Sequence, residues 1–183
     1  MPESPGDLLP IQEIDTEAFQ KVKRSIEQGS YTTLIGAPDE AKPIVDRLGI
    51  ELAQTHATMR LTVPEAGKDF PAVLSEFIPL APEEARGVVS KDVGFTFNFS
   101  RLMEKTAKVS EKPVLAIIES LQHVTFARDD LIRVVRALAN DRASDKDLRK
   151  LTFLLVADQH PSDLLEDSFG TPYNIGTNIY LQT

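Results

Sequence analysis

The sequence contains no cysteine and no tryptophan, and only three histidines among its 183 residues. Without cysteine the chain has no disulfide framework, no thiolate zinc site and no cysteine nucleophile. The histidines, at positions 56, 123 and 160, are too few and too scattered to favour a histidine-built metal site. These absences exclude the cysteine-based classes of site and argue against a structural metal.

Basic residues are also scarce. Twenty Lys and Arg stand against 28 Asp and Glu, so the net charge is −8 and the pI is about 4.9. No run of Lys and Arg could follow a phosphate backbone, so we expect neither nucleic-acid nor anionic-membrane binding. No apolar stretch approaches the roughly 18 residues of a membrane span, and the N-terminus lacks the basic and apolar regions of a signal peptide. The sequence predicts a cytoplasmic protein.

What is present is a globular pattern, with 42% hydrophobic and 26% charged residues. Apolar residues at helical spacing predict an amphipathic helix over 16–28, behind an N-cap at Asp15 or Thr16. A β-branched and aromatic strand follows at 31–35, then a glycine turn and a second helix through 44–52. Strand, glycine turn and helix form the opening of a βαβ unit.

The middle of the chain is interrupted by prolines. Residues 59–63 have the composition of a strand, and 68–77 that of a helix. Phenylalanines at every second position of 95–99 alternate with polar residues, which predicts a half-buried strand, and 102–109 predicts a helix.

The last third is clearer. Apolar runs at 113–118 and 151–157 are typical of parallel strands covered on both faces. Between them 131–138 has helical spacing, and 161–165 and 178–181 predict a short helix and a final strand. Alternating strands and helices predict an α/β three-layer sandwich with a mostly parallel sheet of about five strands.

The glycine turn partly matches a phosphate-binding loop, G-x-x-x-x-G-K-[ST], in which backbone N–H groups and a lysine bind phosphate and a hydroxyl holds magnesium. Gly36 and Lys42 keep the required spacing. Ala41 replaces the second glycine and Pro43 replaces the hydroxyl residue, while 39–40 adds two carboxylates. Pro43 has neither the N–H for phosphate nor the oxygen for a metal. These changes argue against tight triphosphate binding.

A second element of such a site is an apolar strand that ends in Asp, for magnesium, followed by Glu, which polarises the attacking water. Here the strand ends in Glu119 and Ser120. Glu119 is the candidate metal ligand, although a solvated carboxylate at a strand end is the simpler interpretation. Ser120 cannot act as the base.

Two long stretches, 136–157 and 160–181, resemble the bacterial AAA-like ATPase domains related to the STAND signalling NTPases. The resemblance extends over about 11–183 and is weakest from 56 to 110. It implies a P-loop NTPase-like sandwich in which 36–42 lies at the phosphate loop and 114–119 at the acidic strand. It divides the chain into an irregular arm, 1–14, and a core, 15–183, without the family's helical lid.

The departures from the family are as informative as the match. Family members with intact motifs have glycine and Ser or Thr where this chain has Ala41 and Pro43. They have Asp and Glu where it has Glu119 and Ser120. Four losses within one site predict a degenerate phosphate loop and a domain without ATPase chemistry.

The leading hypothesis is therefore an inactive STAND-like pseudo-ATPase domain without cofactors. It would be a regulatory, protein-interaction or oligomerisation module in a bacterial signalling or conflict (defence) system. Its partners would be proteins, neighbouring sensor or effector modules, or further copies of the chain. The alternative is a nucleotide-binding ATPase switch that takes ATP and magnesium, with Lys42 on phosphate and Glu119 on the metal. A third idea is an enzyme of different chemistry that uses Asp158 and His160.

Overall fold

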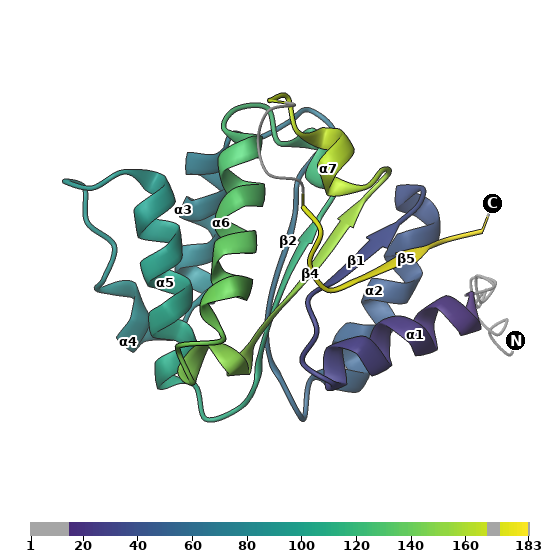
Figure 1. Cartoon of the computed structure of the whole chain (residues 1–183), viewed down its shortest axis with the longest axis horizontal. Coiled ribbons are helices and arrows are strands. Elements are labelled where there is room, and N and C mark those ends of the chain that lie inside the picture. Colours follow the sequence, from purple (N-terminus) through teal and green to yellow (C-terminus); the bar gives the residue numbers. More distant parts are fainter. Residues whose placement is uncertain (1–14, 168–172, 183) are drawn as a thin grey trace, which may run out of the picture.

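The computed structural model describes residues 15–167 and 173–182, so the predicted arm lies outside the described residues. Its centre is a five-stranded sheet in the order β2-β3-β4-β1-β5, in which every pair of neighbours is parallel (Figure 1). The strands are β1 (Thr32–Ile35), β2 (Ala57–Thr62), β3 (Val114–Glu119), β4 (Leu151–Ala157) and β5 (Thr177–Tyr180). The predicted α/β fold class is confirmed.

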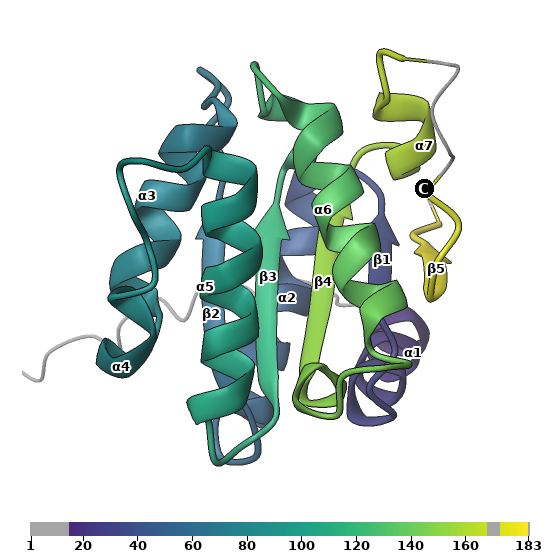
Figure 2. The same ribbon diagram turned by 60° about the vertical axis from the view of Figure 1, so that its left-hand side comes forward.

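Helices cover both faces of the sheet. They are α1 (Thr16–Glu27), α2 (Pro38–Leu52), α3 (Phe70–Leu80), α4 (Glu83–Arg86), α5 (Phe95–Val109), α6 (Arg128–Asp141) and α7 (Pro161–Leu164). Two short 3-10 helices, η1 (Leu121–His123) and η2 (Asp147–Lys150), complete the described elements. Helices α1 and α2 pack on one face, and α3, α5 and α6 lie on the other (Figure 2). Within the described residues, no helix combines the length and the hydropathy needed to cross a membrane.

The two apolar runs form the central strands because both of their faces are covered. Every residue of β3 and of β4 is buried. Leu115 and Ile117 pack toward α1 and α2, whereas Ala116 and Ile118 pack toward the helices of the other face. Alternate residues of a strand point to opposite faces, so a strand that is apolar throughout needs a helix layer on each side.

The first helix forms as its pattern predicts. The Asp15 carboxylate accepts a hydrogen bond from the Ala18 N–H, at 2.9 Å, and thereby caps the N-terminus. Phe19, Val22 and Ile26 form its buried face. The first helix of the sequence analysis is confirmed to within one residue.

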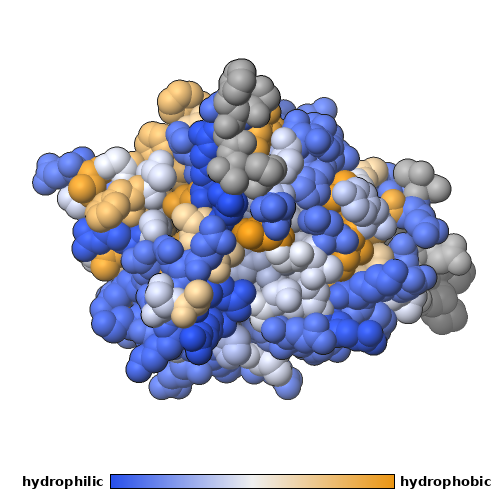
Figure 3. Space-filling view, in the orientation of Figure 1, coloured by the Kyte–Doolittle hydropathy of each residue, from blue (hydrophilic) through white to orange (hydrophobic). Residues whose placement is uncertain are grey.

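The predicted strand at 95–99 is wrong, because these residues begin α5. Phe95 and Phe99 are one helical turn apart, and both pack edge-on against Phe70, at ring distances of 5.1 and 5.4 Å. Leu102 continues the same buried face, whereas Phe97 points to solvent with 56% of its surface exposed. Figure 3 shows apolar side chains at the surface where α5 begins. An alternating pattern over five residues also fits a helix with one exposed aromatic residue.

Candidate functional site

The strand order creates one point where the chain changes direction across the sheet. From β1 the chain passes through α2 to β2 at the far edge and returns through β3 to β4, beside β1. Ligands of open parallel sheets bind at the carboxyl ends of the strands, at such a switch point. Gly36, Glu119 and Asp158 lie at this edge, at the ends of β1, β3 and β4. It is the candidate site.

The connection from β1 to α2 is only two residues long. Gly36 and Ala37 join the strand to a helix that begins at Pro38. The N–H groups of Glu40 and Ala41 donate to the Ala37 carbonyl, at 3.1 and 3.0 Å. A phosphate loop keeps such N–H groups free to bind the anion. In this conformation residues 38–41, which precede the candidate lysine, belong to the first turn of the helix.

The contacts of Gly36 explain why a glycine stands there. Its N–H donates to the Ala157 carbonyl at 3.0 Å. A Cβ atom at Gly36 would lie 2.7 Å from two side-chain carbons of Leu181. Leu181 is held in this position by its own N–H, which donates to the Ile35 carbonyl at 2.8 Å. Packing against the end of the last strand therefore requires a residue without a side chain.

The other residues of the turn lie on α2. Ala41 is buried among the apolar residues that face the sheet. The Lys42 side chain is 67% exposed, and its ammonium group pairs with Asp46 at 2.7 Å. Pro43 lies inside the helix, where it removes one hydrogen-bond donor.

Glu119 is held by two side chains of the neighbouring strand. It is 5% exposed, and it accepts hydrogen bonds from Arg60 Nε at 2.6 Å and from Arg60 Nη2 at 3.0 Å. The Thr62 hydroxyl donates to the same carboxylate at 2.8 Å. The register of β2 on β3, which pairs Thr62 with Glu119, brings these groups together. A bidentate Arg–carboxylate pair is among the strongest polar contacts in proteins.

The remaining guanidinium nitrogen of Arg60 contacts Asp46, at 2.8 Å. Lys42, Asp46, Arg60 and Glu119 thus form a continuous series of alternating charges, here called the ion chain. Burial acts to raise the pKa of Asp46, but hydrogen bonds from Lys42 and Arg60 outweigh it and lower that pKa. The hydrogen bond to Glu119 is the main reason that the pKa of Arg60 is raised. The ion chain has no net charge, and each of its members is already paired.

Two members of the ion chain were not identified from the sequence. Arg60 lies between Met59 and Leu61 in an otherwise apolar strand. A charged side chain at such a position indicates an oppositely charged partner on a neighbouring strand or on a helix that covers the sheet. Asp46 follows Lys42 by four residues, which on a helix is the spacing of an ion pair. Neither signal reveals that Glu119 is the third partner, because that contact depends on the strand register.

A metal-binding cluster is absent from residues 15–167 and 173–182, where no three His, Asp or Glu side chains are grouped to hold an ion. Ser120, which follows Glu119, has a left-handed backbone with φ of 59°. This conformation turns the chain sharply from β3 into η1.

The third hypothesis involved Asp158 and His160. His160 Nδ1 accepts a hydrogen bond from the Ser162 N–H at 3.1 Å and so caps the short helix α7. Its ring lies 6.5 Å from that of Tyr173. Asp158 is exposed, and its N–H points to the Gln122 side chain at 3.4 Å. The His160 side chain therefore stabilises the N-terminus of α7.

Comparison with known proteins gives little at the sequence level. No family model matches the chain. A segment of 76 residues is 32% identical to part of an uncharacterized WD repeat-containing protein of Synechocystis sp.. It covers 40% of this chain and 6% of that protein.

Solved structures are more informative. The Aeropyrum pernix ORC2 protein in its ADP form matches 99% of the chain with a TM-score of 0.61 and 15% identity. A Walker-type ATPase of Pyrococcus abyssi matches 90% with a TM-score of 0.60 and 10% identity. The A. pernix ORC1 protein in complex with DNA matches 94% with a TM-score of 0.57 and 10% identity. The chain has a P-loop ATPase fold.

This P-loop ATPase-like domain corresponds to only part of each of these proteins. The chain spans 50%, 52% and 47% of those three proteins, about half of each. At such low identity the likeness shows the fold alone. What the domain does must be argued from its own residues.

Proposed function

We propose that this P-loop ATPase-like domain is an inactive, STAND-like pseudo-ATPase. It would serve as a regulatory, protein-interaction or oligomerisation module of a bacterial signalling or defence system. The observation that carries the proposal is the ion chain. A phosphate loop needs a free lysine, and a magnesium site needs a free carboxylate. Here both groups are neutralised by partners of the same chain.

Both key contacts would have to be exchanged before a nucleotide could bind. Lys42 would leave Asp46, and Glu119 would leave Arg60 and Thr62. The first turns of α2 would also have to open, since their N–H groups are bonded within the helix. Opening a helix and breaking a bidentate pair both oppose binding.

Protein partners fit the domain better than nucleic acid does. The A. pernix ORC1 structure contains DNA, but this chain has a net charge of −8. Such a charge disfavours binding to a phosphate backbone. One relative in sequence, at 32% identity over 76 residues, is a WD repeat-containing protein, of which the match covers 6%. The acidic charge of this chain therefore favours contacts with proteins over contacts with nucleic acid.

The second candidate is a nucleotide switch with an altered phosphate loop. It is favoured by one observation, that a protein in its ADP form shares the fold over 99% of the chain. In this case Lys42 would bind phosphate and Glu119 would bind magnesium, with Gly36 beside them. The two proposals differ in whether any nucleotide binds.

Calorimetric titration with ATP and ADP, with and without magnesium, distinguishes them. We expect no heat of binding at millimolar nucleotide for the unaltered chain or for Lys42→Ala. Lys21→Ala is the matched control, because Lys21 also pairs with a carboxylate four residues away on an exposed helix face. Binding that is lost in Lys42→Ala and kept in Lys21→Ala would reject the pseudo-ATPase and establish the switch.

A further inference from the structure

The end of the sheet where its strands begin holds a cavity of about 400 Å³, here called the amino-end cavity. Because the strands are parallel, the residues that come just before them meet at this end. Four of the lining residues precede β1, β2, β3 and β4 in this way, and they are Gly29, His56, Pro113 and Lys150. Figure 2 shows β3 and β4 rising from this end of the molecule. The cavity therefore lies opposite the candidate site, which is at the carboxyl ends of the strands.

The wall of the cavity is positively charged, although the whole chain has a net charge of −8. Arg149 and Lys150 line it, and among the described residues that line it Glu27 alone carries a carboxylate. The Lys23 ammonium group lies 4.0 Å from Glu27 and offsets its charge. Lys150 Nζ donates to the Ser110 carbonyl at 2.8 Å, a contact that leaves its charge uncompensated.

Two arginines are held side by side at this wall. Arg149 Nε donates to the Arg142 carbonyl at 3.2 Å, and Arg142 Nη2 donates to the Arg149 carbonyl at 3.4 Å. A Cβ atom at Gly29, which lines the cavity, would lie 3.3 Å from Arg142 Nη2. In the described part of the chain, neither arginine nor Lys150 has a carboxylate within 4.0 Å. Like charges held together without a counter-ion favour an anion as ligand.

The His56 side chain is 9% exposed, and its hydrogen bonds determine which ring nitrogen carries the proton. The Thr55 hydroxyl donates to the Leu52 carbonyl at 3.3 Å, so its oxygen accepts from His56 Nδ1 at 2.9 Å. Burial lowers the pKa of His56, and the charge of Glu27 acts in the opposite direction. At pH 7 the ring is therefore neutral, and Nε2, which has no partner among the described residues, carries the lone pair. Protonation at lower pH makes Nε2 a donor.

We propose that the amino-end cavity binds a small organic oxyanion, a carboxylate or a sulfate or phosphate ester, whose oxygens contact Arg149 and Lys150. Guanidinium and ammonium groups form strong, charge-assisted hydrogen bonds to such oxygens. Thr152, which is 3% exposed, adds a hydroxyl to the wall. The volume lies within the range of small-molecule sites, roughly 300–1,000 Å³, and leaves room for an organic body beside the charged group. The charged groups that line the cavity with His56 are Glu27, Arg149 and Lys150, so protonation of His56 adds a further positive charge and should strengthen binding.

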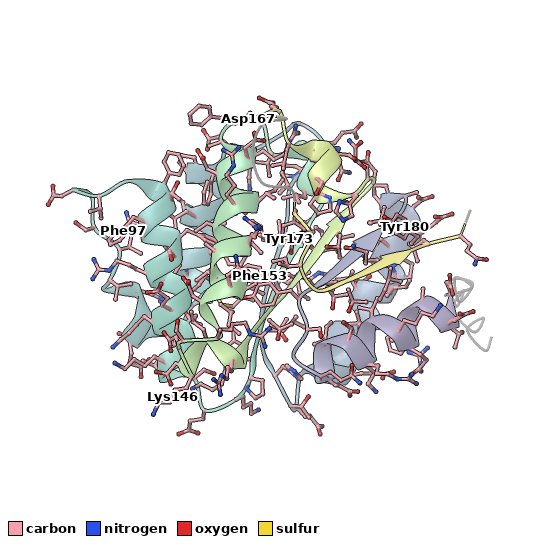
Figure 4. All side chains as sticks on the ribbon, in the orientation of Figure 1. Phe97, Lys146, Phe153, Asp167, Tyr173 and Tyr180 are labelled. Atoms are coloured by element: carbon pink, nitrogen blue, oxygen red, sulfur yellow. The ribbon has the colours of Figure 1, made fainter. Side chains whose placement is uncertain are left out.

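Proton NMR of the three histidine rings tests the site, because His56 is the histidine that lines the cavity. The probes are benzoate, phenyl sulfate and inorganic sulfate, which are anionic at both pH 7.5 and pH 5.5. We expect benzoate or phenyl sulfate to move the His56 signal and to bind about fivefold more tightly at the lower pH. Arg149→Gln should weaken this binding about tenfold. Lys146→Gln is the matched control, because Lys146 is an exposed lysine at the same end of the molecule but outside the cavity (Figure 4), and it should change the affinity less than twofold.

The two organic probes distinguish the ligand classes. Tighter binding of benzoate would indicate a carboxylate, and tighter binding of phenyl sulfate would indicate a sulfate or phosphate ester. A His56 signal that neither probe moves would overturn the proposal, and so would an Arg149→Gln variant that binds as tightly as the unaltered chain. Inorganic sulfate bound as tightly as both organic probes, or an affinity that does not rise at the lower pH, would also overturn it. Lys42→Ala should bind the probes unchanged, so these outcomes are independent of whether the domain binds nucleotide at its candidate site.

Discussion

Replacing Arg60 with alanine is expected to lower the free energy of unfolding by about 3 kcal/mol, the low end of the range for breaking a buried ion pair. The low end applies because the Arg60 side chain is 31% exposed, whereas that of Glu119 is 7% exposed. The substitution leaves the Glu119 carboxylate buried, with the Thr62 hydroxyl as its remaining donor. Chemical denaturation at pH 7 measures the loss.

The opposite end of the ion chain gives the control. Lys42→Ala removes an exposed partner of Asp46, and such pairs contribute about 0–1 kcal/mol. The double variant Arg60→Met, Glu119→Leu removes both buried charges and should recover most of the stability. A loss for Lys42→Ala as large as that for Arg60→Ala, or no recovery in the double variant, would contradict this account of the ion chain.

Replacing Gly176 with alanine is expected to lower the free energy of unfolding by about 3 kcal/mol, from left-handed strain together with lost hydrogen bonds. Gly176 has φ of +69°, a conformation that alanine rarely adopts. An added Cβ would overlap the Tyr31 carbonyl group. The chain around Tyr31 and the chain around Gly176 would therefore have to move apart. The first bond between β1 and the chain entering β5, from the Thr177 N–H to Tyr31, would be lost.

Gly49→Ala is the matched control for that substitution. Gly49 lies within α2, and a Cβ there would meet nothing within 4 Å. Alanine should therefore raise the free energy of unfolding by up to about 1 kcal/mol, the difference in helix propensity. Thermal unfolding of both variants measures the two changes in the free energy of unfolding. Equal changes would contradict the prediction that the contact with Tyr31 makes the Gly176 substitution the more destabilising one.

The central strands could be predicted because each signal there is local. The apolar runs at 113–118 and 151–157 have the length of strands and no helical spacing, and both form strands of the sheet, β3 and β4. Two patterns conflict at 95–99. The alternation of phenylalanines fits a strand, but the buried face continues to Leu102 and Thr106 at helical spacing. The pattern over the longer segment determines the structure, since a helix is stabilised over several turns.

For the candidate site, the positions of two residues could be predicted from the sequence, but the contacts between its residues could not. Glu119 could be placed at a strand end from its own neighbours, and Lys42 from its distance to Gly36. The contact of Glu119 with Arg60 depends on which strands are neighbours and on their register, and neither is encoded locally. The start of α2 at Pro38 was also missed, although proline is favoured in the first turn of a helix.

The strand order also governs when the sheet can assemble. Strand β1 lies between β4 and β5, and both of these strands come from the C-terminal third of the chain. During synthesis β1 therefore has neither of its hydrogen-bonded neighbours until residues 151–180 have emerged, although α1 and α2 are already available to cover one of its sides. Pairings between distant segments form slowly, because the loop must close before the contacts stabilise it. Chains that stop before β4 would leave β1 with two open edges, and such edges favour aggregation.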